Sequence, residues 1–220
     1  MMSTEPTLAD LVATNPSAAK VFQRYGLDYC CGGKQSLKEA CAAGRVDADT
    51  VLRELAAAET GGGDEVRWAE RPIDQLIEHI LDRYHAPLRA ELPRLVDLAR
   101  QVERVHADKP DRPDGLADLL ADVYAAVTSH LAKEEQILFP LIRSGRGQNA
   151  YMPVQVMVQE HEDHGQNLRR IRKLTNNLKL PDYACASWRE LYRALGELEV
   201  DLMDHIHLEN NILFPRALAG

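Results

Sequence analysis

The sequence predicts an all-α protein, with an up-down-up-down four-helix bundle preceded by a small helical domain. Its 220 residues include 56 Leu and Ala but only 29 Val, Ile and Thr, and such an excess of helix formers over β-branched residues favours helices. With 27% charged and 5% aromatic residues, the composition is that of an ordinary folded protein. Four long helical patterns with short connections between them predict the bundle.

A polar, glycine-rich stretch divides the chain into two unequal parts. We expect a small helical domain over residues 1–58, a linker over 59–71 and the bundle over 72–220. A domain of about 58 residues is marginal on its own, because a chain this short buries little apolar surface. The linker is expected because the chain there reads Glu59-Thr60-Gly61-Gly62-Gly63-Asp64-Glu65.

Local start and stop signals place two helices in the small domain. Pro16, preceded by a capping asparagine, begins the first helix, and Gly26 ends it. Ser36 and Glu39 form a capping box that begins the second helix, which Gly44 ends. The turn between the two helices is expected to expose backbone and thiols, because it reads Asp28-Tyr29-Cys30-Cys31-Gly32-Gly33-Lys34.

Four longer segments carry the helical patterns of the bundle. Pro87 and Pro93 are expected to kink the first segment. Ser187 and Glu190 are expected to form a second capping box at the start of the last segment. Their lengths and short connections predict antiparallel neighbours. The expected segments are 72–106, 114–143, 153–180 and 187–215.

Charge, hydropathy and cysteine usage exclude several classes of protein. A net charge of −8 and a pI near 5.5 argue against a nucleic-acid partner. No apolar run approaches the ~18 residues of a membrane span, so we expect no membrane partner, and the first residues lack the basic-then-apolar pattern of a signal peptide. Cys30 and Cys31 are neighbours that cannot pair without strain, which predicts reduced thiols and a cytoplasmic protein.

An internal repeat carries the strongest functional signal. Each copy has a histidine, a glutamate four residues later and the sequence Ile-Leu-Phe-Pro, so that six of eleven aligned positions are identical. Residues four apart lie on one face of a helix, and each copy therefore presents an imidazole and a carboxylate in one direction. The two copies are His130–Pro140 and His205–Pro215.

The repeat predicts a metal rather than a pair of isolated acids. Glu134 and Glu209 precede apolar residues that direct this face toward the core. Two buried carboxylates cost several kcal/mol each (roughly) unless a positive group neutralises them, and neither copy offers Lys or Arg on that face. The neighbouring Glu135 and Glu160 face elsewhere, and we expect both to be exposed to solvent.

Depth along the bundle adds two further histidines to the site. In an up-down bundle, the first and third segments begin at the end where the second and fourth finish. His85 lies 13 residues after the start of its segment and His161 lies eight after the start of its own. At about 1.5 Å per residue, these imidazoles share one layer with His130 and His205. The predicted metal ligands are His85, His130, Glu134, His161, His205 and Glu209.

The remaining histidines are not predicted to be ligands. At about 100° per residue, His207 and His79 point away from the ligand on their own helix, and His106 lies near the opposite end of the bundle. His164 is only about 60° from the direction of His161. It is therefore either a surface residue, which we favour, or an outer group or extra ligand of the site.

The donor set predicts the kind of metal. Four imidazoles and two carboxylates without a thiolate favour iron or manganese over structural zinc. Six side chains exceed the needs of one ion. If both carboxylates bridge two ions, each ion receives two nitrogens and two oxygens, and an oxo or hydroxo bridge leaves one position open for O₂ or NO. This reading implies two ions of iron or manganese as the cofactor.

These motifs resemble those of a known family. The C-terminal part resembles the hemerythrin-like di-iron bundle, and nearly the whole chain resembles the iron–sulfur cluster repair di-iron proteins (repair of iron centres). The resemblance implies two non-haem iron ions as the cofactor and the same six ligands, with Glu134 and Glu209 as bridges, in a cytoplasmic homodimer associated with nitrosative and oxidative stress. Oxygen-carrying hemerythrins use a fifth histidine and one bridging aspartate, so they match less well. The motifs that carry the resemblance are Phe22–Gly33, Arg83–His85, Val102–Pro110, Lys133–Pro140 and His205–Pro215.

The two adjacent cysteines belong to the family pattern, and we interpret them as functional. In a glycine-flanked turn the Cys30 and Cys31 thiols are expected to be accessible, with Lys34 lowering a thiol pKa. They would carry NO, hold iron transiently or reduce the metal centre; the alternative is that they are reduced turn residues with no chemistry. Cys41 and Cys185 are expected to be packing residues.

Three functions would each use the same di-iron pair with an open position. The leading hypothesis is repair of iron–sulfur clusters in damaged client proteins, with NO or O₂ bound at the di-iron centre. The second is an enzyme that reduces two NO molecules to N₂O. The third is a sensor or buffer that binds O₂ or NO without turnover, although a simple carrier has no need of a thiol-containing domain.

Overall fold

The computed structural model describes residues 5–61 and 66–220, and the described chain is helical with no β-strand. One isolated antiparallel bridge joins Thr7 to Ser36. Residues 62–65 of the expected linker lie outside the described residues. The expectation of no signal peptide rests on the first five residues, and of these only Glu5 is described. Four helices form the N-terminal region: α1 (Leu8–Thr14), α2 (Ala18–Tyr25), α3 (Leu37–Gly44) and α4 (Ala48–Gly61).

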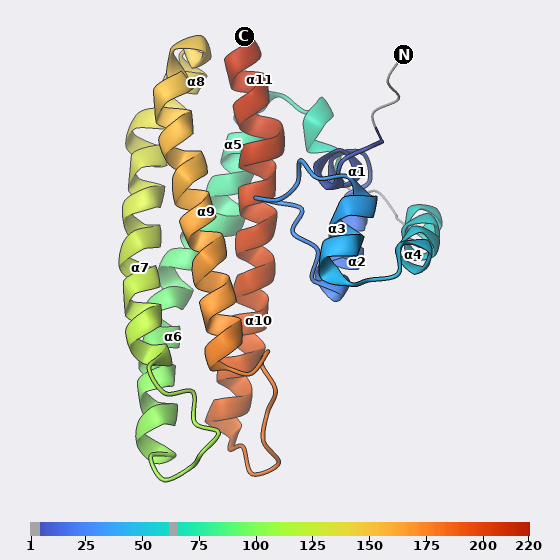
Figure 1. The fold of residues 1–220 in the computed structure, drawn as a ribbon. Coiled ribbons are helices and arrows are strands. Elements are labelled where there is room, and N and C mark those ends of the chain that lie inside the picture. Colours follow the sequence, from blue (N-terminus) through green and yellow to red (C-terminus); the bar gives the residue numbers. More distant parts are fainter. Residues whose placement is uncertain (1–4, 62–65) are drawn as a thin grey trace.

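Four antiparallel rods form the bundle, which confirms the predicted fold class (Figure 1). Short 3₁₀ helices, η1 (Trp68–Glu70) and η4 (Gly147–Ala150), precede the first and third rods. Three rods are interrupted by π-helical turns, labelled η2, η3 and η5. In chain order the rods comprise α5 (Ile73–Ile80), η2 (Leu81–His85) and α6 (Ala86–Val105); α7 (Leu116–Lys133), η3 (Glu134–Leu138) and α8 (Phe139–Arg143); α9 (Tyr151–Leu174); and α10 (Ala186–His207), η5 (Leu208–Leu213) and α11 (Phe214–Ala219).

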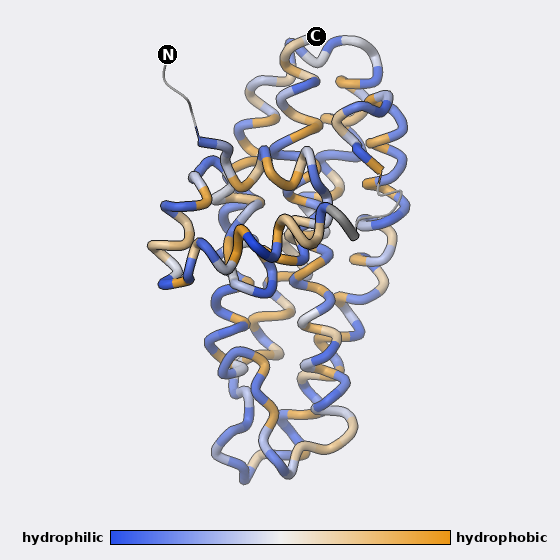
Figure 2. The backbone as a smooth tube through the Cα atoms, turned by 90° about the vertical axis from the view of Figure 1, so that its right-hand side faces the viewer, coloured by the Kyte–Doolittle hydropathy of each residue, from blue (hydrophilic) through white to orange (hydrophobic). Residues whose placement is uncertain are grey.

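Apolar side chains from all four rods fill the bundle. Leu95 of α6, Leu120 of α7 and Trp188 and Ile206 of α10 are fully buried, and Met157 of α9 is 3% exposed. Apolar and polar residues alternate along each rod (Figure 2), as expected for helices that bury one face. Within the described ranges, no helix combines the length and the hydropathy that a membrane crossing requires.

Each π-helical turn is followed by a proline in the sequence. The sequence predicts simple kinks at prolines and not π-helical turns. A proline lies two residues beyond each of them: Pro87, Pro140 and Pro215. Proline has no N–H, so the carbonyl four residues earlier loses its α-helical donor. The residue before each proline instead donates five residues back; for example, the Phe139 N–H bonds the Glu134 carbonyl. Pro93, by contrast, lies inside α6 without a break in the helix.

The helix-start predictions are partly right. The capping box of Ser36 and Glu39 is present and begins α3 as predicted. The helix expected at Pro16 begins two residues later, at Ala18, because the preceding asparagine ends α1 instead. The capping box expected at Ser187 is absent. There α10 begins at Ala186 after Cys185 as the N-cap, which places Ser187 in the first turn.

The N-terminal region has its own small core and packs beside α10 and α11 (Figure 1). Phe22, Tyr29 and Val51 are fully buried in that core. The contacts with the bundle are both polar and apolar: the Tyr29 hydroxyl donates to Asp204 over 2.5 Å, and Met203 packs against the small core. The turn between α2 and α3 therefore lies against the rods rather than projecting into solvent.

Candidate metal centre

The six predicted ligands come together in one buried layer. His85 ends η2, Glu134 begins η3 and Glu209 lies in η5, so each π-helical turn carries one of them. The other three lie within α7, α9 and α10. All six side chains are at most 2% exposed: His85, His130, Glu134, His161, His205 and Glu209.

Their donor atoms form two sets that share both carboxylates. One set contains His85 and His205, whose Nε2 atoms lie 3.2 Å apart. The other contains His130 and His161, whose Nε2 atoms lie 3.1 Å apart. Within each set, the ligand atoms of the two histidines and of both glutamates lie within 4.8 Å of one another.

Each carboxylate directs one oxygen to each set. The oxygens of Glu134 lie 3.4 Å from the Nε2 atoms of His85 and His130. Those of Glu209 lie 3.1 Å from the Nε2 atoms of His205 and His161. This arrangement would allow both carboxylates to bridge two cations, each with two imidazoles.

Buried polar atoms without partners show that a cation fits this site. Both oxygens of Glu134 and of Glu209 are buried and accept no hydrogen bond from the described residues. Burial, and then the adjacent Glu209 carboxylate, raise the pKa of Glu134. Desolvation also acts to raise the pKa of Glu209, but His205 and His161 outweigh it and lower that pKa. A cation held between these oxygens would offset the cost of burying two carboxyl groups.

An outer shell of polar side chains orients three of the four imidazoles. The Nδ1 atoms of His85 and His130 lie 2.9 Å from carboxylate oxygens of Glu135 and Glu160. The Nδ1 atom of His161 lies 2.8 Å from the Asn210 side-chain oxygen. Such bonds fix the ring so that Nε2 faces the metal position.

The expectation that Glu135 and Glu160 face solvent is therefore wrong. Both side chains are only about a third exposed or less, at 32% and 24%. Arg89 lies 2.9 Å from Glu135, and Lys133 pairs with Glu160. Each acid thus joins a cation near the surface to a buried imidazole. The helical-face argument failed because it considered only directions toward the centre of the bundle, and an acid directed sideways still reaches the ring of a neighbouring rod.

Three of the other histidines lie away from the six, as predicted. His79 stacks on Trp68 with ring centroids 4.2 Å apart. His106 packs against Trp188, near the opposite end of the bundle, with centroids 4.8 Å apart. His207 is buried beneath the N-terminal region and accepts a hydrogen bond from Asn211 over 3.0 Å.

His164 is buried, so the favoured surface assignment is wrong. Its side chain is 3% exposed and its ring centroid lies 5.0 Å from that of His130. Burial, followed by the neighbouring His161 and His205, lowers the pKa of His164 to about 4. The helical-face argument missed this burial because it measured only the angle from His161, whereas α9 packs against α7 and covers His164.

The cysteine turn is not freely accessible, which corrects a second expectation. Cys30 is 5% exposed and Cys31 is partly buried. The Asp28 carboxylate accepts from both backbone N–H groups and from the Cys30 thiol, 3.2 Å away. The neighbouring Cys31 thiol and burial raise the pKa of Cys30, so the predicted activation by Lys34 is absent there.

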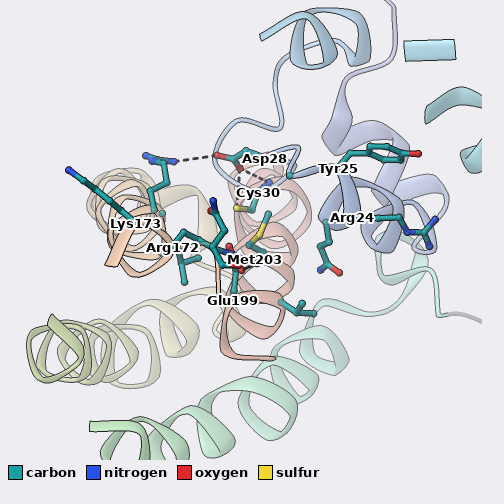
Figure 3. Close-up of a pocket in the computed structure, with 15 residues that line it drawn as sticks. Arg24, Tyr25, Asp28, Cys30, Arg172, Lys173, Glu199 and Met203 are labelled. Atoms are coloured by element: carbon teal, nitrogen blue, oxygen red, sulfur yellow. Dashed lines mark hydrogen bonds and ion pairs between the residues drawn. The ribbon is translucent and has the colours of Figure 1, made fainter. Parts of the chain in front are cut away.

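The turn nevertheless reaches the metal layer from outside. The Cys31 thiol donates to the backbone carbonyl of the predicted ligand His161, 3.4 Å away. Asp28, Cys30 and Cys31 form a further group whose ligand atoms lie within 4.8 Å. Figure 3 shows Asp28 and Cys30 above Met203 at the edge of a pocket of about 860 Å³ between this turn, α9 and α10. Cys41 is buried in the small core, as predicted.

Two features of the site were missed at the level of sequence. The π-helical turns were not predicted, although the proline after each was visible. Asn210 and Asn211 lie within the second repeat, where they replace Glu135 and Gln136 of the first. One bonds a ligand histidine and the other donates to the Tyr29 carbonyl over 3.2 Å. This difference between the two copies of the repeat is the sequence feature that could have indicated a separate role for the two asparagines.

The fold and the site together define a class: a metal-binding helical bundle of the hemerythrin type. The family model described as the hemerythrin HHE cation binding domain matches residues 76–217, which implies iron as the metal. A second model, described as a domain of unknown function (DUF542), matches residues 4–59.

Full-length relatives then identify the particular family. The iron-sulfur cluster repair protein YtfE of Cronobacter sakazakii is 50% identical over 214 residues, covering 97% of this chain and 96% of the relative. The proteins of that name from Dickeya chrysanthemi and Escherichia coli O157:H7 are each 46% identical, over 98% and 97% of this chain and 98% and 96% of their own. The chain belongs to the YtfE family of iron–sulfur cluster repair proteins.

Loss of either shared carboxylate should empty the site. We expect purified protein to hold about two iron ions per chain, and Glu134→Ala or Glu209→Ala to lose most of them, because each removes an oxygen from both sets. Iron per chain after anaerobic desalting measures this. His79→Ala and His207→Ala are matched controls that should keep their iron. Full retention in both glutamate variants would contradict the bridging assignment.

The metal-free protein should lose stability as the pH falls from 7 to 5. Burial lowers the pKa of His207 to about 4, whereas the unfolded residue titrates near its ordinary 6.5. Between these values the unfolded state binds the extra proton, so acid favours unfolding, by about 2 kcal/mol at pH 5 for one such histidine. Urea unfolding at both pH values tests this. His207→Gln should show a smaller loss between pH 7 and pH 5, and an unchanged loss would refute the assignment.

Proposed function

We propose that this protein repairs iron–sulfur clusters damaged by nitrosative or oxidative stress, and that it binds NO or O₂ at a non-haem di-iron centre. The relatives that cover nearly the whole chain carry the name of iron–sulfur cluster repair proteins. We also propose the division into an N-terminal domain over 1–58, a linker over 59–71 and a di-iron bundle over 72–220. The targets are damaged iron–sulfur proteins.

One observation carries this proposal: two donor sets share two carboxylates. Each set supplies two nitrogens and two oxygens, which is fewer donors than iron takes in higher coordination. A bridging group and a small ligand would complete each set. The buried layer keeps the charge of the ions out of water, and that strengthens the field they exert on a ligand.

The residues around the centre would tune and protect it. Glu135 and Glu160 hold the Nδ1 protons of two ligands, which makes those imidazoles better donors to a cation. Phe139 and Phe214 stack on His85 and His161, with centroids 5.6 and 6.0 Å apart. These rings exclude water from the outer sides of the ligands.

We assign the thiols of Cys30 and Cys31 to the repair step. The position of the turn supports this assignment. The Cys31 thiol bonds the His161 carbonyl, and the turn lines a pocket that could admit a small ligand. The raised pKa of Cys30 favours the protonated thiol, and metal binding there would require loss of that proton. The thiolate would then lose its hydrogen bond to the Asp28 carboxylate, which would repel it.

A reconstituted repair assay tests the function. A purified dehydratase whose [4Fe–4S] cluster has been damaged with NO should regain activity when the iron-loaded protein is added. Glu209→Ala should give little recovery, since it holds little iron. Cys30→Ser/Cys31→Ser should keep its iron but lose most of the rate. Full-rate recovery with this double variant would remove the thiols from the mechanism, and no recovery with the wild type would refute repair.

The two adjacent donor sets also favour a second candidate, reduction of NO. When bound, two ferrous ions supply two electrons, which with two protons convert two NO molecules into N₂O and H₂O. In this fold the shared carboxylates would hold both ions within one buried layer.

Single-turnover mixing of the diferrous protein with NO separates this enzyme from a binding protein. A reductase should form about one N₂O per two ferrous ions, measured in the headspace by gas chromatography. Glu134→Ala, which should lack a complete pair, is the control. Stable NO binding without N₂O would exclude the reductase and leave the repair proposal unaffected.

A further inference from the structure

One buried side chain beside the metal centre has no partner. Within the described ranges, three side chains have both of their polar atoms buried and without a hydrogen bond: Glu134, Glu209 and His164. The two glutamates face the metal positions. A buried imidazole with neither its donor nor its acceptor satisfied is costly, and so His164 calls for a partner that the protein itself does not supply.

His164 is not placed as a further ligand. Neither of the two donor sets whose atoms lie within 4.8 Å includes it. Its ring nonetheless stands edge-on to that of His130, with centroids 5.0 Å apart and an interplanar angle of 89°. The corresponding spacing between the paired ligands His130 and His161 is 4.8 Å. The ring thus lies one layer outside the donors, on the side of the second set.

This position makes the two metal positions chemically unequal. The ligand His205 of the first set has Tyr84 stacked on it, with ring centroids 5.6 Å apart and planes 10° apart. The ligand His130 of the second set has His164 instead. A neutral imidazole offers one N–H donor and one acceptor nitrogen, whereas a stacked phenol ring presents its face.

We propose that His164 donates a hydrogen bond to a small ligand, NO or O₂, held at the position between His130 and His161. This inference rests on the proposed function, because it names the residue that contacts its ligand. A ligand atom with a lone pair satisfies the buried N–H, and the hydrogen bond favours retention of the ligand at this position over the one flanked by Tyr84. His164 is therefore a ligand-positioning residue, and it acts without contacting the cation.

The test compares wild type, His164→Leu and His164→Gln as iron-loaded diferrous proteins. Leucine fills the space without a donor, and glutamine keeps an N–H donor on a side chain of similar reach. NO dissociation, followed by stopped-flow absorbance with an NO trap, should be about five- to tenfold faster in His164→Leu. It should stay near the wild-type rate in His164→Gln. The N–O stretch in the infrared spectrum should move to higher frequency in the leucine variant alone.

Iron content and a buried control separate the possible outcomes. All three proteins should hold equal iron, and His207→Leu, which changes a buried histidine outside this layer, should release NO at the wild-type rate. Unchanged dissociation and stretch in His164→Leu would overturn the inference while leaving the proposed function standing. Loss of iron from His164→Leu would make His164 a ligand and overturn its role as a donor. Iron-loaded wild type that takes up no NO or O₂ would contradict both proposals.

Discussion

The structure depends on two carboxylates that lie together in one buried layer of the bundle. Glu134 and Glu209 are fully buried, and the Nε2 atoms of the four imidazoles around them face a common space. Like charges at this distance cannot both remain ionised without a cation. The four rods are thus held in register by a requirement for positive charge, and iron meets it in the hemerythrin class.

The polar side chains around these carboxylates form successive layers toward the surface of the bundle. Glu135 and Glu160 hold the rings of two ligands, and Arg89 and Lys133 pair with those acids nearer the surface. Each of these imidazoles is therefore linked through a carboxylate to a cationic side chain near the surface. The two donor sets have similar surroundings but differ in one neighbouring ring. Tyr84 lies beside the first set and His164 beside the second, and a small ligand bound at the centre would contact different groups at the two positions.

The N-terminal region joins the centre through backbone as much as through side chains. Asn211 lies two residues beyond Glu209 and donates to the Tyr29 carbonyl, and the Cys31 thiol donates to the carbonyl of His161. A change in the position of either ligand-bearing helix therefore alters the setting of the cysteine turn. Such a connection is consistent with the proposal that the thiols and the metal serve one task.

The sequence by itself determined the helical class, the four rods and the six residues of the metal layer. Those follow from local rules: helical periodicity, the repeated His-x-x-x-Glu pattern and equal depth from one end of the bundle. The tertiary structure alone decided the rest. Glu135, Glu160 and His164 lie on faces that a single helix would expose. The neighbouring rods bury His164 and partly cover the two glutamates. Lys34 was expected to activate a thiol, and instead the Cys30 thiol is buried and bonded to Asp28. Its burial comes from packing of the turn against the bundle, and such contacts between distant segments leave no mark in local spacing.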